Sequence, residues 1–158
     1  MKNPKPRIVL GTLILVGGIC VAAMAAGKIF AQHLVEDAMA RHPQVAGVEI
    51  SSSPPGKTCM TIASTEAGGR GEKCDDDEFT AMKTNKPFVE KEKEGGKEVY
   101  DITMPLHDAS GKLIGTVGLD FKPDLSLQES EVVQLAGLVV HEMEVQVPTK
   151  ARLFDPAN

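Results

Sequence analysis

Residues 96–121 read GKEVYDITMPLHDASGKLIGTVGLDF, and this stretch predicts two strands joined by a turn. From Val99 to Leu106 apolar and polar residues alternate, which is typical of a strand with one buried face. Asp108–Gly111 has the residues of a tight turn, because Gly111 is free to adopt a left-handed conformation. Lys112–Phe121 then places its apolar side chains on one face again. We therefore expect these two strands to pair antiparallel.

A third strand is expected before this pair, and further elements on either side of it. Pro87–Glu92 has strand character, and the two glycines at 95 and 96 supply the positive φ angles that a tight hairpin needs. Ser126 is expected to cap a long C-terminal helix, with Glu129 completing a capping box. The remaining expected elements are a helix, two strands and a short helix, over Lys28–Arg41, Val45–Ser51, Thr58–Ser64 and Asp75–Met82.

The N-terminal residues predict export. Ile8–Gly27 is an almost unbroken apolar run without charge, and Lys2, Lys5 and Arg7 precede it. About 20 apolar residues can span a bilayer as a helix, and basic residues before such a run hold the N-terminus in the cytoplasm. Small residues near Gly27 also fit cleavage of a signal peptide. We expect a periplasmic or otherwise extracytoplasmic domain, either anchored by residues 8–27 or released after cleavage.

Composition excludes nucleic-acid binding and leaves one cysteine question open. All 22 acidic residues follow Gly27, whereas 3 of the 17 lysines and arginines precede it, which leaves a net charge of −8 beyond this point. A surface of that sign repels nucleic acid and anionic lipid. Cys59 and Cys74 could form a disulfide in an oxidising compartment, although their spacing alone leaves this open. No metal site is expected, because the histidines are isolated and no CxxC motif is present.

The order of elements on an exported domain resembles the Cache family, the PAS-like extracellular sensor domains of bacterial receptors. In that family a strand ending in proline and an apolar residue leads through an Asp-x-x-Gly turn into a glycine-rich apolar strand. Pro105-Leu106, Asp108–Gly111 and Gly115–Phe121 follow this pattern here. The resemblance implies an α+β fold, with an antiparallel sheet flanked by N-terminal and C-terminal helices. It divides the chain into a signal or anchor segment, a sensor domain and a C-terminal helix with its tail, over residues 1–27, 28–125 and 126–158.

The resemblance also implies a pocket between the sheet and a covering segment over Pro54–Lys86. The side chains expected to line this pocket are Met60, Tyr100, Met104 and Val117. Lys57 or Arg70 could supply a positive charge for a carboxylate ligand. Plain core packing is the alternative interpretation of the four uncharged side chains, since methionine often serves as filler.

Two functions follow, and the sequence leaves both open. The first is an exported sensor module that binds a small molecule and, lacking an output domain of its own, acts through a partner protein such as a membrane receptor. The second is a structural or assembly module with a filled core and no ligand. No arrangement of nucleophile and base can be drawn from the spacing of residues. We therefore expect no enzymatic activity and no cofactor.

Overall fold

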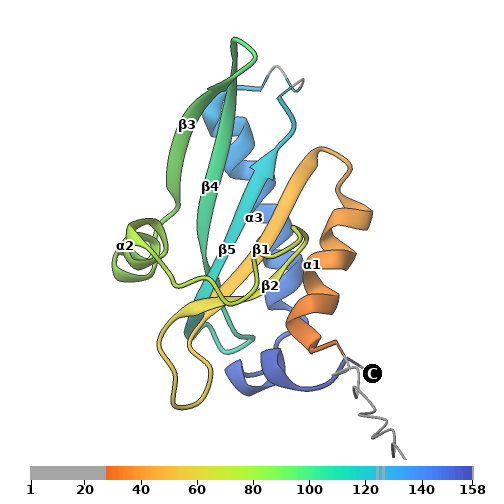
Figure 1. Ribbon diagram of the computed structural model, residues 1–158, viewed down its shortest axis with the longest axis vertical. Helices are drawn as coiled ribbons and strands as arrows, with labels where there is room; N and C mark the ends of the chain where they lie inside the picture. Colours follow the sequence, from red (N-terminus) through yellow and green to blue (C-terminus); the bar gives the residue numbers. More distant parts are fainter. Residues whose placement is uncertain (1–27, 124, 126, 158) are drawn as a thin grey trace, which may run out of the picture.

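Five antiparallel strands form the centre of the fold, and helices lie against both of its faces (Figure 1). The computed structural model describes residues 28–123, 125 and 127–157. In chain order the elements are α1 (Phe30–Arg41), β1 (Val45–Ser52), β2 (Met60–Ser64), α2 (Asp76–Thr84), β3 (Phe88–Glu94), β4 (Lys97–His107), β5 (Leu113–Phe121), α3 (Glu129–Glu144) and a 3-10 helix (Lys150–Phe154). The expected α+β class with an antiparallel sheet is confirmed.

The strands lie in the order β2-β1-β5-β4-β3, so the predicted meander of β3, β4 and β5 makes up three-fifths of the sheet. Ile102 pairs with Leu119 and Met104 pairs with Val117 across β4 and β5. The predicted turn between these strands is present, with Gly111 at a φ of +81° and its N–H donating to the Asp108 carbonyl over 2.8 Å.

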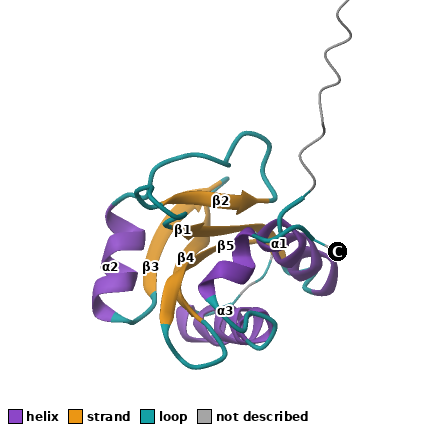
Figure 2. Ribbon diagram, turned by 90° about the horizontal axis from the view of Figure 1, so that it is seen from below, coloured by secondary structure: helices purple, strands orange, loops and turns teal. Residues whose placement is uncertain are grey.

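The two faces of the sheet differ in chemistry. Helices α1 and α3 pack on one face, where Ile102, Val117 and Leu119 are almost fully buried. Figure 2 shows these two helices on the same side of the strands and α2 on the other. On the α2 side the register brings polar residues together, because Asp101 lies opposite Asp120, and Glu49 lies opposite Gly118. The sheet therefore has an apolar face under two helices and a polar face under α2.

The start of α3 differs from the prediction. Gln128 occupies the N-cap position, and its N–H donates to the Glu131 carboxylate over 2.8 Å, so the capping pattern occurs two residues later than expected. Leu125 still donates its N–H to the Lys122 carbonyl, which shows that the chain is turning at that point. Ser126 itself lies outside the described residues.

Helix α1 also begins later than predicted, at Phe30. The reason is tertiary, since the preceding residues pair with the end of the chain instead. Lys28 accepts a hydrogen bond from the Ala157 N–H, and Ile29 forms a β-bridge with Pro156. The expected signal or transmembrane segment at residues 8–27 lies outside the described residues. No helix within the described part is both long and apolar enough to cross a membrane.

Cys59 and Cys74 form the disulfide that the sequence left open, with their Cα atoms 5.4 Å apart. Backbone contacts bring the two residues together, because the Cys74 N–H donates to the Cys59 carbonyl and Met60 forms a bridge with Lys73. The segment between β2 and α2 is thereby fixed along the edge of β2 and passes in front of the sheet in Figure 1.

Candidate functional site

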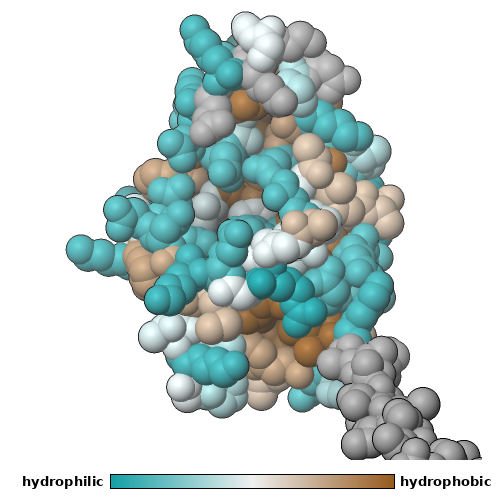
Figure 3. All heavy atoms as spheres, in the orientation of Figure 1, coloured by the Kyte–Doolittle hydropathy of each residue, from teal (hydrophilic) through white to brown (hydrophobic). Residues whose placement is uncertain are grey.

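A hollow lies on the polar face of the sheet, beside the segment that joins β2 to α2. It consists of two adjoining cavities of about 300 and 270 Å³, and Glu66, Asp101 and Asp120 line both of them. Glu49 and Ser64 complete the polar lining of the smaller cavity. We call this the acidic hollow. Figure 3 shows that hydrophilic side chains predominate over this side of the molecule.

Two glycines make room for the carboxylates of the acidic hollow. A Cβ atom on Gly118 would stand 2.8 Å from Glu49 Cγ, and one on Gly47 would collide with the Asp120 carboxylate. Both glycines therefore let a carboxylate of the neighbouring strand lie across the backbone. The hollow is built into the sheet by its strand register and does not depend on the loops alone.

Burial and neighbouring charges govern the electrostatics of the hollow. Burial, and after it the negative charges of Glu78, Asp101 and Asp120, together raise the pKa of Glu49 from 4.5 to about 7. No hydrogen bond holds the Glu49 carboxyl among the described residues. Because a carboxylate in such surroundings is costly to ionise, a cation placed beside it would be strongly favoured.

Glu78 ties α2 to the same face. Its carboxylate accepts hydrogen bonds from Ser51 Oγ over 3.1 Å and from the Asp75 N–H over 2.8 Å. Burial also raises the pKa of Glu78. The second bond belongs to the capping box that starts α2, so the N-terminus of the helix is held against β1 by a side chain of its own first turn.

The structure does not bring the five predicted pocket residues together. Tyr100, Met104 and Val117 belong to the apolar face, where they pack with the core under α1 and α3. The expected arrangement, in which Pro54–Lys86 covers this face, needs correction because α1 and α3 cover it, whereas β2 is a strand of the sheet itself and α2 lies on the opposite side. Only Tyr100 reaches the acidic hollow, at its rim.

Lys57, Met60 and Arg70 line a different cavity, of about 510 Å³, together with Ile29, Pro54 and Phe154. We call this the β2-edge hollow. Two of the expected pocket residues, Lys57 and Met60, therefore lie together with the alternative cation Arg70, but away from the polar face of the sheet. The cations expected for a carboxylate ligand are exposed there.

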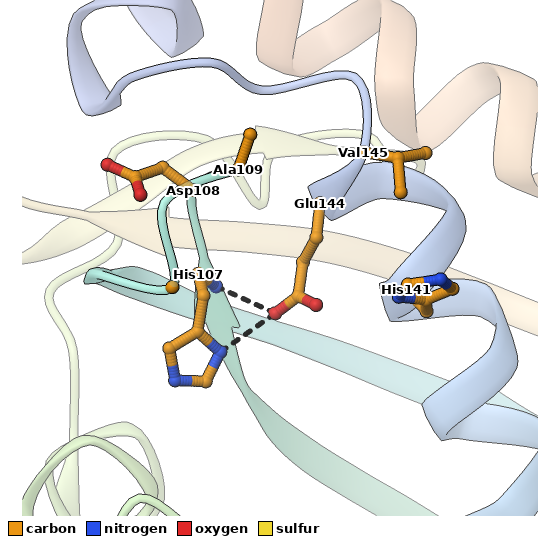
Figure 4. Close-up of a pocket in the computed structure, with 7 residues that line it drawn as sticks. His107, Asp108, Ala109, His141, Glu144 and Val145 are labelled. Atoms are coloured by element: carbon orange, nitrogen blue, oxygen red, sulfur yellow. Dashed lines mark hydrogen bonds and ion pairs between the residues drawn. The ribbon is translucent and has the colours of Figure 1, made fainter.

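A further cavity, of about 610 Å³, lies between the turn after β4 and the C-terminal end of α3 (Figure 4). Its carboxylates and the His107 side chain already have partners. Glu144 accepts hydrogen bonds from the His107 backbone N–H over 2.9 Å and from the His107 ring over 2.8 Å. The Asp108 carboxylate accepts bonds from Ser110 and Lys112 within its own turn, and the Ser110 hydroxyl lowers its pKa. These contacts hold β4, its turn and α3 together.

Sequence reasoning missed the carboxylates of the acidic hollow. Asp101 and Asp120 are the polar members of two alternating strands, and the pairing of those strands places them opposite each other. The signal was available, because alternation already assigned Asp101 to the face opposite Tyr100. The position of Glu49 required the pairing of β1 with β5, which no local pattern reveals.

Comparison with known families gives no match to this sequence, and comparison with curated proteins gives none either. Among solved structures, a type II free methionine-R-sulfoxide reductase from Thermoplasma acidophilum aligns over 80% of this chain and 93% of its own, with a TM-score of 0.52 and 11% identity. A candidate GAF sensor protein from Burkholderia vietnamiensis aligns over 77% and 76%, with a TM-score of 0.51 and 16% identity. These likenesses place the fold in the PAS/GAF-like class, and Cache membership is not shown.

The same comparison corrects one expectation. We expected this chain not to be an enzyme, but a protein named as a reductase shares its fold. The fold therefore gives no ground for excluding catalysis. At 11% identity the likeness extends to the fold alone, so the reductase activity is not carried over to this chain.

Proposed function

We propose that this protein is an exported sensor-type module that binds a small cationic molecule in the acidic hollow. One observation carries the proposal: Glu49 is half-buried, has no hydrogen-bonding partner among the described residues, and is surrounded by other carboxyl groups. An organic ammonium or guanidinium group would offset this charge and could donate hydrogen bonds to the Ser64 hydroxyl or to carbonyl groups of the strand backbone. Cavities of about 300 and 270 Å³ are large enough for a small metabolite but not for a peptide.

The fold class supports this proposal without naming the ligand. A GAF sensor-like structure shares the arrangement of the chain, and the Cache resemblance of residues 96–121 fits the same class. We propose that the chain is a sensor of this structural class that acts outside the cytoplasm. Export and anchoring by residues 8–27 are part of the proposal. A carboxylate ligand at Lys57 and Arg70 stays a prediction, and it is tested below as a competing occupant of the β2-edge hollow.

A thermal-shift series on the full chain tests the ligand class. We expect putrescine, arginine or choline to raise the melting temperature, and succinate and phosphate to leave it unchanged. Glu49→Gln should abolish the rise, because it removes the charge and keeps the shape. Glu98→Gln is the matched control, since it makes the same change at an exposed carboxylate on the opposite face of β4.

The outcomes separate the two functions. A cation-dependent shift that survives Glu49→Gln would move the site elsewhere and contradict the acidic hollow. If no cation raises the melting temperature at any pH between about 5 and 8, the small-molecule function fails, and the structural or assembly module becomes the better account.

We further propose that the ligand-bound state is passed to a partner protein that contacts α3. Leu138 on this helix and Val145 at its C-cap are 60% and 63% exposed, although both are apolar. Exposed apolar side chains on one helix are a common feature of interaction surfaces. A photo-crosslinker at position 138 should give an adduct in the host whose yield changes with ligand, whereas one at Glu98 should not. An adduct whose yield does not change with ligand would contradict transfer of the signal through α3.

A further inference from the structure

The end of the molecule where the chain enters the fold carries an unusual combination of apolar and basic side chains. In the β2-edge hollow, Ile29, Met60 and Phe154 are half-buried, while Lys57 and Arg70 are exposed. Figure 3 shows apolar atoms reaching the surface at the lower end of the view, bordered by hydrophilic ones. The exposed basic side chains set this end apart from the domain as a whole, because the residues beyond 27 carry a net charge of −8.

Both cations are available for an external partner. Neither Lys57 nor Arg70 forms an ion pair with a described residue. Other basic groups nearby are already engaged, since Lys28 pairs with Glu36 over 2.8 Å and the Arg152 guanidinium lies 4.0 Å from the centre of the Phe30 ring. The hollow therefore presents two uncompensated positive charges beside an apolar floor.

At this end, backbone hydrogen bonds join the start of the described chain to its last residues. The Ala157 N–H donates to the Lys28 carbonyl over 2.7 Å, and the Phe30 N–H donates to the Asp155 carbonyl over 2.7 Å. Figure 1 shows the last described residues, after the 3-10 helix, beside the start of α1. The apolar run ends at Gly27, so Ile29, which lines the hollow, follows it by two residues, or about 7 Å of chain.

We propose that the β2-edge hollow rests on the membrane surface and binds the headgroups of anionic phospholipids. This inference rests on the proposed anchoring by residues 8–27. Lys57 and Arg70 would pair with lipid phosphates, while Ile29, Met60 and Phe154 would lie at the boundary of the acyl chains. The rest of the domain is acidic and is repelled by the same surface, so this end faces the membrane and the remainder points away.

Hydrogen exchange of the full chain in nanodiscs tests the proposal. One set of discs contains phosphatidylcholine alone, and the other contains phosphatidylglycerol at about one lipid in three. We expect amides in residues 56–60 and 67–72 to exchange severalfold more slowly in the anionic discs, by about fivefold for each cation that binds a headgroup. Amides of α2 should not change.

Lys57→Gln with Arg70→Gln should remove the difference between the two kinds of disc. Lys83→Gln with Lys86→Gln is the matched control, because it removes the same charge from exposed positions at α2, and it should keep the difference. Unchanged melting temperatures establish that both pairs of variants still fold.

Several results would overturn the proposal: equal exchange in both discs, a chain that does not enter discs at all, or protection that appears only when two copies share a disc. Protection of the same amides by citrate without lipid would instead assign the hollow to a soluble carboxylate. The cation-dependent melting shift of the acidic hollow is measured without lipid, so either proposal can fail while the other stands.

Discussion

At Gly111 the backbone has a φ of +81°, and no heavy atom lies within 4 Å of where a Cβ would be built. The cost of a side chain there is therefore conformational strain alone, because space is not limiting. Gly111→Ala should lower the free energy of unfolding by about 1 kcal/mol, and Gly111→Val by more, since a β-branched residue resists positive φ. The turn joins the central strands β4 and β5, so the loss should appear in the global denaturation midpoint.

Gly137 provides the matched control for this prediction. It lies within α3, again with no heavy atom within 4 Å of a built Cβ, but its φ is not positive. Gly137→Ala should therefore raise stability by up to about 1 kcal/mol. Urea denaturation of both variants measures the pair, and effects of the same sign would contradict the conformational argument.

Glu49 should impose a pH dependence on stability. Its folded pKa of about 7 lies above the usual 4.5, so folding favours the protonated form. The stability associated with this carboxyl is fully present below about pH 4.5 and is lost as the pH rises to about 7. After allowance for solvent screening, the loss is of the order of 1–3 kcal/mol.

Glu49→Gln should therefore be more stable than the wild type at pH 8 and about equal to it at pH 4. Taking the difference between variant and wild type isolates Glu49 from Glu78, whose pKa is also raised. Denaturation curves across this pH range measure the effect. A difference that stays constant with pH would mean that Glu49 is not buried among like charges.

At the scale of elements, the contact between α3 and β4 depends on Glu144. This carboxylate accepts two hydrogen bonds from His107, one from its backbone N–H and one from its ring. Glu144→Ala should lower stability by about 1–3 kcal/mol. Glu142→Ala on the same helix breaks an exposed ion pair with Arg41 and a contact with the His42 ring, without freeing a backbone group, and should cost about 1 kcal/mol or less. Equal costs would contradict the structural role of Glu144.

The segment between β2 and α2 depends on the disulfide. Cys59 and Cys74 are separated by 15 positions, and a loop of that length corresponds to about 3 kcal/mol on the chain-entropy account. Replacing both with serine should lower stability by up to that amount. It should also speed hydrogen exchange in residues 65–73 more than in β4. Uniform acceleration across the fold would mean that the bridge does not specifically hold this segment.

Local patterns predicted the strands that pair with their sequence neighbours, and they failed where distant residues decide. The meander followed from alternation and from turn residues such as Gly111, because each hairpin is settled within about 25 residues of sequence. The segment expected to cover Tyr100 and Met104 does not do so, because α1 and α3 pack on their face of the sheet. Alternation separates the faces of β4 correctly, but which face α1 and α3 cover depends on packing between ends of the chain.

For the whole molecule, the acidic hollow could be predicted only in part. Asp101 was visible as a polar residue on the face opposite Tyr100, but its meeting with Glu49 needs β1 beside β5, a pairing across about 70 residues. The β2-edge hollow also joins distant residues, since Ile29, Lys57 and Phe154 come from three separate parts of the chain.

Orientation across the membrane is the last prediction, and it concerns the whole chain. Lys2, Lys5 and Arg7 precede the apolar run, so the positive-inside rule sends everything after residue 27 out of the cytoplasm. An alkaline phosphatase fused after Asn158 should be active, because its folding requires an oxidising compartment, and a cytoplasmic reporter there should be silent. The Cys59–Cys74 bridge fits the same compartment. Moving three basic residues to follow Gly27 should reverse the activity of both reporters. If the unaltered chain gave an active cytoplasmic reporter and an inactive phosphatase, export would be contradicted. Contact of the β2-edge hollow with the extracytoplasmic surface of the membrane would then be contradicted as well.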